Sequence, residues 1–119
     1  MPAAERPSRG WYTVDSAIQS LLREFAGELR TTYGSRLRGV YLFGSYARGE
    51  ADPESDVDVL VVLDHIERYG LEIDRTGAFT AELALKYGVS ISRVFVSHQE
   101  WSRGESAFLA NVKEEAVPA

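Results

Sequence analysis

The chain has 119 residues, no cysteine, and no apolar run long enough to cross a bilayer. The lack of cysteine excludes disulfides and thiolate metal sites, and it is typical of proteins from a reducing compartment. A membrane span needs roughly 18 or more consecutive apolar residues, so we expect no membrane insertion. The opening segment MPAAERPSRG lacks the apolar core of a signal peptide. These absences predict a cytoplasmic protein.

A basic excess is also lacking, because the formal net charge is -5. Broad electrostatic binding to nucleic acid is therefore disfavoured. The length allows one hydrophobic core and leaves no room for a second. Prolines, a glycine and mixed charges in residues 1–12 predict a flexible leader. We expect a single domain over residues 13–115.

Apolar periodicity predicts helices and strands in mixed order. The first helix has Thr13 as N-cap and ends near Tyr33. The remaining predicted elements are strands over 40–43, 57–63 and 89–96, and helices over 71–87 and 101–112. In the second helix we expect four residues to face inward: Ala78, Phe79, Leu83 and Tyr87.

The order of these elements predicts an α/β (α+β) fold, with a small mixed β-sheet flanked by helices. A helix connects the last two strands, which makes a parallel crossover possible. The strand over 57–63 is almost wholly apolar, so both of its faces should be covered.

The segment YLFGSYARGEADPESDVDVLVVL, residues 41–63, places two carboxylates at the start of that apolar strand. Side chains alternate along a strand, so Asp56 and Asp58 share a face, with Cα atoms about 6.5–7 Å apart. Two such carboxylates repel each other unless a cation lies between them. Oxygen ligands of this kind suit Mg²⁺. Asp56 and Asp58 are therefore the candidate metal ligands and catalytic residues.

Gly44 and Ser45 follow the first strand and provide a candidate phosphate site. Glycine lets a phosphate approach the backbone closely. A helical turn beginning at Ser45 would direct free N–H groups at an anion, and Arg48 would add a charge-assisted contact. Each element alone has an ordinary explanation: a turn for Gly-Ser, a solvated strand end for Asp-x-Asp, and a turn cap for Ser55. Their combination favours a triphosphate site.

Gly44-Ser45, ten residues and then Asp56-Val57-Asp58 resembles the signature of the minimal nucleotidyltransferases, a family of the polymerase-β-like superfamily. The similarity spans most of residues 13–103. The resemblance implies that Gly44 and Ser45 bind the phosphates of ATP and that Asp56 and Asp58 hold Mg²⁺. We add Arg48 and Ser55 to the candidate nucleotide-binding residues.

The resemblance also implies a partner protein. Small members of the family are often antitoxins that pair with a helical HEPN toxin, an RNase, and some add AMP to a tyrosine of that toxin. We therefore expect Mg²⁺-dependent transfer of AMP from ATP to a hydroxyl of a HEPN toxin or another protein acceptor. A domain of this size can cover only one side of a nucleotide cleft well. We therefore expect a partner chain or a second copy of this chain to complete the cleft.

One feature of the superfamily has no counterpart in the expected strand. A third carboxylate commonly comes from a neighbouring strand, but residues 89–96 contain no acid. Where the third carboxylate is expected, the sequence has Ser90, Ser92 and Arg93. The acids that could replace it are Asp64, Asp74 and Glu82, but nothing in the sequence places them near the metal site. We interpret Glu114 and Glu115 as a solvated helix end.

Two alternatives follow. The first is a catalytically weak or inactive nucleotide-binding antitoxin that neutralises its toxin by direct binding. The second is a transferase for small aminoglycoside-like antibiotics, which shares the motif but normally needs an added domain.

Overall fold

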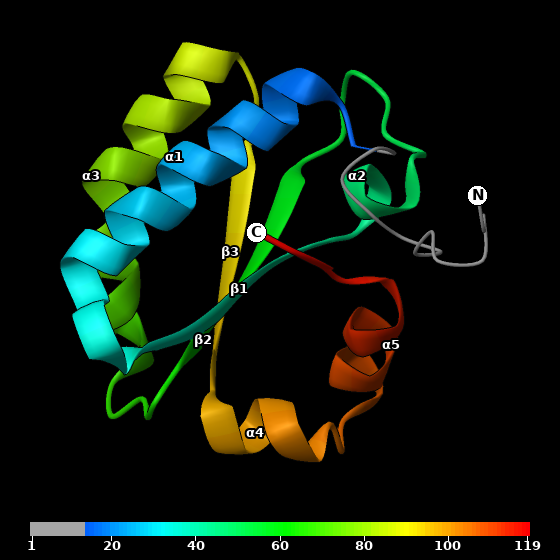
Figure 1. Cartoon of the computed structure of the whole chain (residues 1–119). Coiled ribbons are helices and arrows are strands. Elements are labelled where there is room, and N and C mark those ends of the chain that lie inside the picture. Colours follow the sequence, from blue (N-terminus) through cyan, green and yellow to red (C-terminus); the bar gives the residue numbers. More distant parts are fainter. Residues whose placement is uncertain (1–13) are drawn as a thin grey trace, which may run out of the picture.

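A four-stranded mixed sheet forms the centre of the computed structural model, which describes residues 14–119 (Figure 1). The elements are α1 (Ser16–Tyr33), the 3-10 helix η3 (Gly34–Arg36), β1 (Leu37–Phe43), α2 (Ser45–Arg48), β2 (Val57–Leu63), α3 (Tyr69–Tyr87), β3 (Ile91–Ser97), α4 (His98–Arg103), α5 (Ala107–Glu115) and β4 (Val117–Pro118). The strand order is β3-β2-β1-β4; β2 and β3 are parallel, and the other two pairs are antiparallel. The predicted mixed sheet and parallel crossover are both confirmed.

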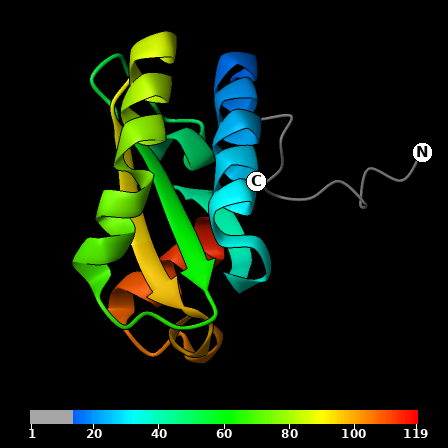
Figure 2. The same cartoon turned by 90° about the vertical axis from the view of Figure 1, so that its left-hand side faces the viewer.

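Helices cover both faces of the sheet (Figures 1 and 2). Helices α1 and α3 lie on one face, while α4 and α5 lie on the other. Strand β2 alternates between these two layers: Val57, Val59 and Val61 pack with α1 and α3, whereas Leu60 and Val62 pack on the α5 side. The expectation that both faces of β2 are buried is confirmed.

Helix α1 follows its predicted apolar stripe. Its buried residues recur every three or four positions and include Ile18, Leu21, Leu22, Phe25 and Leu29. The N-cap is Asp15, whose side chain accepts a hydrogen bond from the Ala17 N–H at 2.8 Å. The predicted cap Thr13 and the predicted leader over 1–12 lie outside the described residues.

Helix α3 buries a polar stripe. Its buried residues are Glu72, Thr76, Thr80 and Leu83. Ala78, which we expected to face inward, is exposed. The reason is geometric: Ala78 lies two residues from both Thr76 and Thr80, roughly 200° around a helix with 3.6 residues per turn. The predicted contacts of Phe79 and Tyr87 with the core are present, although both side chains are only partly buried.

The C-terminal region holds two short helices, so the single helix predicted over 101–112 is wrong. Gly104, with φ of 58°, ends α4 in the left-handed conformation. Ser106 then starts α5 by accepting a hydrogen bond from the Leu109 N–H at 3.0 Å. After α5, Val117 and Pro118 pair with Leu42 and Tyr41 of β1. This pairing holds α5 near the end of β1.

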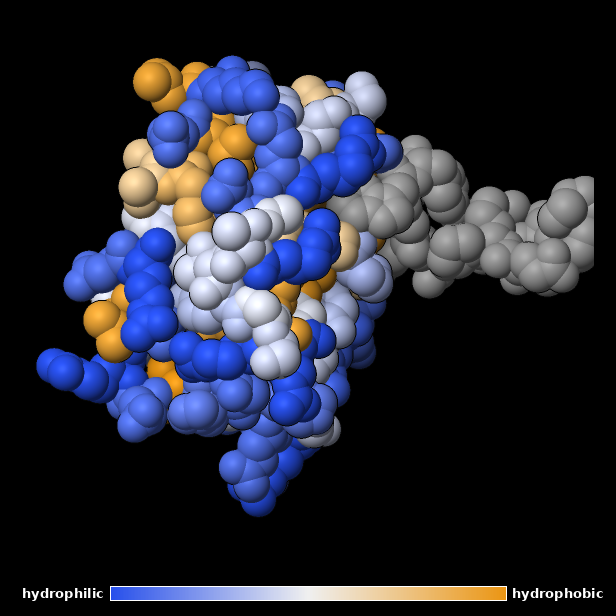
Figure 3. Space-filling model, turned by 60° about the vertical axis from the view of Figure 1, so that its left-hand side comes forward, coloured by the Kyte–Doolittle hydropathy of each residue, from blue (hydrophilic) through white to orange (hydrophobic). Residues whose placement is uncertain are grey.

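Exposed apolar side chains are scattered over the described part of the chain. The large ones are Tyr69, Leu71 and Leu85 on α3 and Phe108 on α5. On the face seen in Figure 3, hydrophobic colour occurs in small separate areas within polar surface. Among residues 14–119, no helix combines the length and the apolar character needed to cross a bilayer.

Candidate functional site

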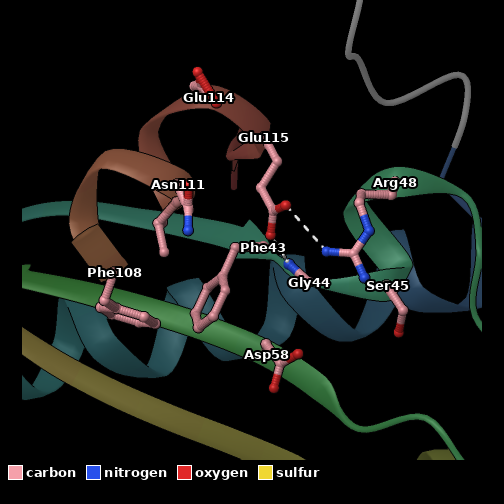
Figure 4. Close-up of a pocket in the computed structure, with 10 residues that line it drawn as sticks. Phe43, Gly44, Ser45, Arg48, Asp58, Phe108, Asn111, Glu114 and Glu115 are labelled. Atoms are coloured by element: carbon pink, nitrogen blue, oxygen red, sulfur yellow. Dashed lines mark hydrogen bonds and ion pairs between the residues drawn. The ribbon is translucent and has the colours of Figure 1, made fainter.

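A cavity of about 540 Å³ opens where β1 ends, between α2 and α5 (Figure 4). Its lining comes from four elements and the turn between two of them: Phe43, Gly44, Ser45, Arg48, Asp58, Phe108, Asn111, Val112, Glu114 and Glu115. Phe43 and Asp58 are register partners in the antiparallel β1–β2 pair, so their side chains lie on the same face of the sheet. That face is the one covered by α5, which supplies the second wall of the cavity.

Gly44 shapes the turn between β1 and α2. Its φ of 79° belongs to the region that favours glycine, and a Cβ atom here would overlap the carboxylate of Asp58. The Gly44 carbonyl accepts hydrogen bonds from the amides of Ala47 and Arg48 at 3.0 and 3.1 Å. The Gly44 N–H points into the cavity and donates to Oε2 of Glu115 at 2.6 Å.

Arg48 provides the positive charge of the cavity. Its Nε donates to Glu50 at 2.9 Å, and its Nη1 donates to Oε1 of Glu115 at 3.0 Å. Hydrogen bonds to these two carboxylates raise the pKa of Arg48. The guanidinium therefore stays charged beside the Gly44 amide, which is the combination that an anionic phosphate recognises.

Asp58 and Asp56 provide the negative charge on the β2 side of the cavity. Asp58 is half-buried near the start of β2, while Asp56 is exposed just before that strand begins. Burial raises the pKa of Asp58, and the nearby charges of Asp56 and Glu115 raise it further. Ionised Asp58 is thus disfavoured, and a bound cation would relieve the repulsion.

The donor set fits a hard divalent cation such as Mg²⁺, which takes one or two carboxylates together with phosphate oxygens and water. Asp56 and Asp58 would hold it. Within residues 14–119, no group of three or more histidine and acidic side chains converges on a metal position. A metal here would take its remaining ligands from water and from a bound phosphate.

The structure brings most of the predicted site residues together. Gly44, Ser45, Arg48 and Asp58 line one cavity, and Asp56 stands beside it with its charge acting on Asp58. Ser55 does not line the cavity: its hydroxyl accepts from the Asp52 N–H at 2.9 Å and stabilises the turn over 52–55. The nucleotide-binding role assigned to Ser55 stays a prediction.

Comparison with known proteins identifies the family of the chain. The family described as "Nucleotidyltransferase domain" matches residues 22–115. The chain belongs to this family. A protein of Methanocaldococcus jannaschii, provisionally named a protein adenylyltransferase, is 35% identical over 98 residues, which are 82% of this chain and 92% of that protein. The resemblance expected from the Gly-Ser and Asp-x-Asp elements is confirmed.

Solved structures with similar folds include a minimal nucleotidyltransferase, with a TM-score of 0.60, 24% identity and coverage of 87% of this chain and 94% of that one. A toxin–antitoxin structure with AMP-PNP gives a TM-score of 0.51 and 23% identity, over 87% of this chain and 69% of that one. These similarities confirm the nucleotidyltransferase fold.

Strand β3 brings no acid to the site of this nucleotidyltransferase domain. Ser92 is the register partner of Asp58, and Arg93 is the partner of Val59, which faces the opposite side of the sheet. Asp64 follows the far end of β2 and accepts a hydrogen bond from Nε of Arg36 at 3.1 Å. Asp74 and Glu82 are exposed on α3, which covers the other face. None of the predicted substitutes reaches the cavity.

Sequence reasoning missed the contribution of α5. We expected Glu115 to be solvated, but its side chain is only 16% exposed and contacts Gly44 and Arg48. Phe108 and Asn111 line the same cavity, and the Phe108 ring packs edge-on against Phe43 with centroids 5.6 Å apart. The spacing of 108, 111 and 115 does place these residues on one helix face. It does not reveal what that face covers.

Proposed function

We propose that this nucleotidyltransferase domain transfers AMP from ATP to a hydroxyl of a partner protein in a Mg²⁺-dependent reaction. The observation that carries the proposal is the close approach of the Gly44 turn to Asp58, because a phosphate bound at the turn would lie next to a cation bound by the carboxylate. The name of the M. jannaschii relative and the AMP-PNP-containing toxin–antitoxin structure support the choice of ATP and of a protein acceptor.

The cavity offers a separate group for each part of the nucleotide. The Gly44 N–H, the Ser45 hydroxyl and Arg48 would bind the triphosphate. A Mg²⁺ ion on Asp56 and Asp58 would neutralise phosphate charge and help position the reacting groups. Phe108 and Asn111 line the same cavity and would contact the nucleoside, the ring by stacking and the amide by hydrogen bonding.

The proposed transfer is a displacement of pyrophosphate at the α-phosphorus of ATP. The acceptor oxygen forms a bond to the α-phosphorus, and the bond from that phosphorus to the oxygen bridging to the β-phosphorus breaks. Pyrophosphate leaves, and the hydroxyl proton is lost to solvent. The acceptor that we propose is a tyrosine of a HEPN toxin, with this chain as the cytoplasmic antitoxin.

A decisive experiment uses ATP labelled at the α-phosphate, Mg²⁺ and the candidate toxin encoded by the neighbouring gene. Label should appear on a toxin hydroxyl, and ATP labelled at the γ-phosphate should leave no label. Asp58→Asn should abolish the transfer. Absence of label in a mixture where the two proteins demonstrably bind would contradict the proposal.

One observation favours a second candidate, a nucleotide-binding antitoxin that acts by covering its toxin. Ser92, not an acid, is the register partner of Asp58 on β3. A variant with both Asp56→Asn and Asp58→Asn separates the two functions. If this variant still protects cells from the toxin, binding alone neutralises it; loss of protection with binding retained supports chemical modification.

A further inference from the structure

The carboxylate of Glu115 lies between Gly44 and Arg48 at one end of the cavity (Figure 4). Gly44 N–H donates to Oε2 of Glu115 at 2.6 Å, and Arg48 Nη1 donates to Oε1 at 3.0 Å. Both oxygens are therefore engaged by a backbone amide and a guanidinium, the two donor types that commonly bind phosphate oxygens. These are the donors that the proposed function assigns to the triphosphate.

The helix dipole of α5 and the charge of Asp58 both oppose an acid at this position. Glu115 is the last residue of α5, where the helix dipole makes a negative charge unfavourable. Arg48 also pairs with the exposed Glu50 at 2.9 Å, so its guanidinium is shared between two carboxylates. Asp58 lies close enough for its charge to repel that of Glu115. The Glu115 carboxylate is held in the cavity by its two hydrogen bonds, against these opposing effects.

The backbone around Glu115 is anchored independently of its side chain. The Ala116 N–H donates to the Val112 carbonyl at 2.8 Å, and Val117 pairs with Leu42 of β1. A glutamate side chain changes position by rotation about its own bonds between staggered rotamers. The carboxylate can thus leave the cradle while α5 and β4 stay in place.

We propose that Glu115 is an internal competitor for the nucleotide: its carboxylate closes the phosphate cradle in the nucleotide-free protein, and the triphosphate must displace it. This inference rests on the proposed function, because it takes the Gly44 cradle to be the triphosphate site. The apparent affinity for ATP is then lower than the intrinsic affinity by the fraction of molecules in which the cradle is open.

The test measures nucleotide affinity in the full chain and in two variants, Glu115→Gln and Glu115→Ala. The ligand is α,β-methylene ATP, which cannot donate AMP, and binding is followed by calorimetry with Mg²⁺ and with EDTA. Glutamine keeps the shape but loses the charge, whereas alanine removes the group. We expect binding to tighten roughly fivefold in the glutamine variant and roughly tenfold in the alanine variant, because a larger fraction of cradles is open.

Glu105→Gln is the matched control, since it removes the same charge from an exposed side chain that lies just before α5 and does not line the cavity. Its affinity should stay within roughly twofold of the parent, because only general repulsion is reduced. A second readout needs no nucleotide: the NMR signal of the Gly44 amide should move in Glu115→Gln and stay in place in Glu105→Gln. Circular dichroism confirms that each variant is folded.

Each outcome has a definite meaning. Tighter binding in both Glu115 variants, with and without Mg²⁺, supports the inference, as does binding that appears only after Glu115 is replaced. Unchanged or weaker binding in these variants, with the parent binding normally, overturns the inference and leaves the proposed function standing. If neither the parent nor any variant binds the analogue, the proposed function fails, and the inference fails with it.

Discussion

Gly44 and Asp58 meet so closely across the β1–β2 pair that no side chain fits at position 44 without displacing the carboxylate. The residue that we propose for phosphate binding and the residue that we propose for metal binding are therefore packed against each other. A substitution at either position should therefore displace the residue at the other. The two halves of the motif thus form one unit in space, although thirteen residues separate them in the chain.

Gly44→Ala should disrupt both halves. The new Cβ would overlap Asp58, and φ of 79° strains any residue with a side chain. We expect loss of nucleotide binding and a fall in the free energy of unfolding of about 1–3 kcal/mol, measured by urea denaturation. Gly27→Ala in α1 is the control: no atom lies within 4 Å of its Cβ position, so it should stabilise the helix by about 0.5–1 kcal/mol. Normal nucleotide affinity in Gly44→Ala would refute the close-packed cradle.

Replacing both Asp56 and Asp58 by asparagine should abolish AMP transfer without weakening the fold. The pKa of Asp58 is raised in the folded state by burial and by neighbouring charges, so its ionisation destabilises the folded protein as the pH rises through its titration range. Asparagine removes that effect. The free energy of unfolding of the variant should equal or exceed that of the parent at pH 7, with a smaller advantage at pH 4. A variant that is less stable at pH 7 would show that the carboxylates support the fold.

Phe108→Ala should weaken nucleotide binding if the ring stacks on the base. Removal of one base–aromatic stack is worth about 1–3 kcal/mol, which corresponds to a clear loss of affinity in calorimetry. Leu85→Ala removes an exposed apolar side chain on α3, on the other face of the sheet, and should leave the affinity unchanged. Equal affinities for Phe108→Ala and the parent would place the nucleoside elsewhere.

Tyr33→Phe tests the buried polar contact between α1 and α3. The Tyr33 hydroxyl donates to Glu72 at 2.7 Å, and burial together with this contact raises the pKa of the phenol. Removing the donor leaves a buried carboxylate with one partner fewer, so we expect a loss of about 1–3 kcal/mol in the free energy of unfolding. Tyr87→Phe, whose hydroxyl meets Glu24 in a more exposed place, should have a smaller effect. Equal losses in urea denaturation would argue against a special role for burial.

Glu24 should contribute to the pH dependence of stability. Hydrogen bonds from Tyr87 and Lys86 of α3 hold the pKa of this α1 carboxyl below its usual value near 4.5. A lowered pKa stabilises the fold above the unfolded value, and this contribution disappears as the pH falls through the folded value. Glu24→Gln should therefore be less stable than the parent at pH 7 and match it at low pH. A constant difference between the two proteins across this range would exclude the linkage.

Local patterns were enough to predict the centre of the fold. The apolar run over 57–63 coincides with β2 because a strand buried on both faces must be apolar at almost every position. The alternation of strand side chains also predicted one face for Asp56 and Asp58, but Asp56 precedes β2, and only Asp58 lines the cavity. The end of α4 at Gly104 also had a local signal, a glycine followed by the cap residue Ser106. Our prediction of one continuous helix over 101–112 overlooked this signal.

The position of α5 could not be predicted in the same way. It depends on β4, a strand of two residues whose pairing with β1 leaves no periodic pattern in the sequence. Glu115 therefore looked like a solvated helix end, because its partners Gly44 and Arg48 lie about seventy positions earlier in the chain. Such long-range contacts arise from tertiary packing and cannot be derived from local propensity.

The alternation along β2 has a consequence for how the chain folds. A shift of one residue in the pairing of β2 with β1 would turn Asp58 toward the apolar core under α1. The same shift would turn Val57 and Val59 away from that core. An ionised carboxylate in such surroundings is strongly unfavourable. Asp58 therefore also favours the correct alignment of the two strands, independently of any ligand that it is proposed to bind.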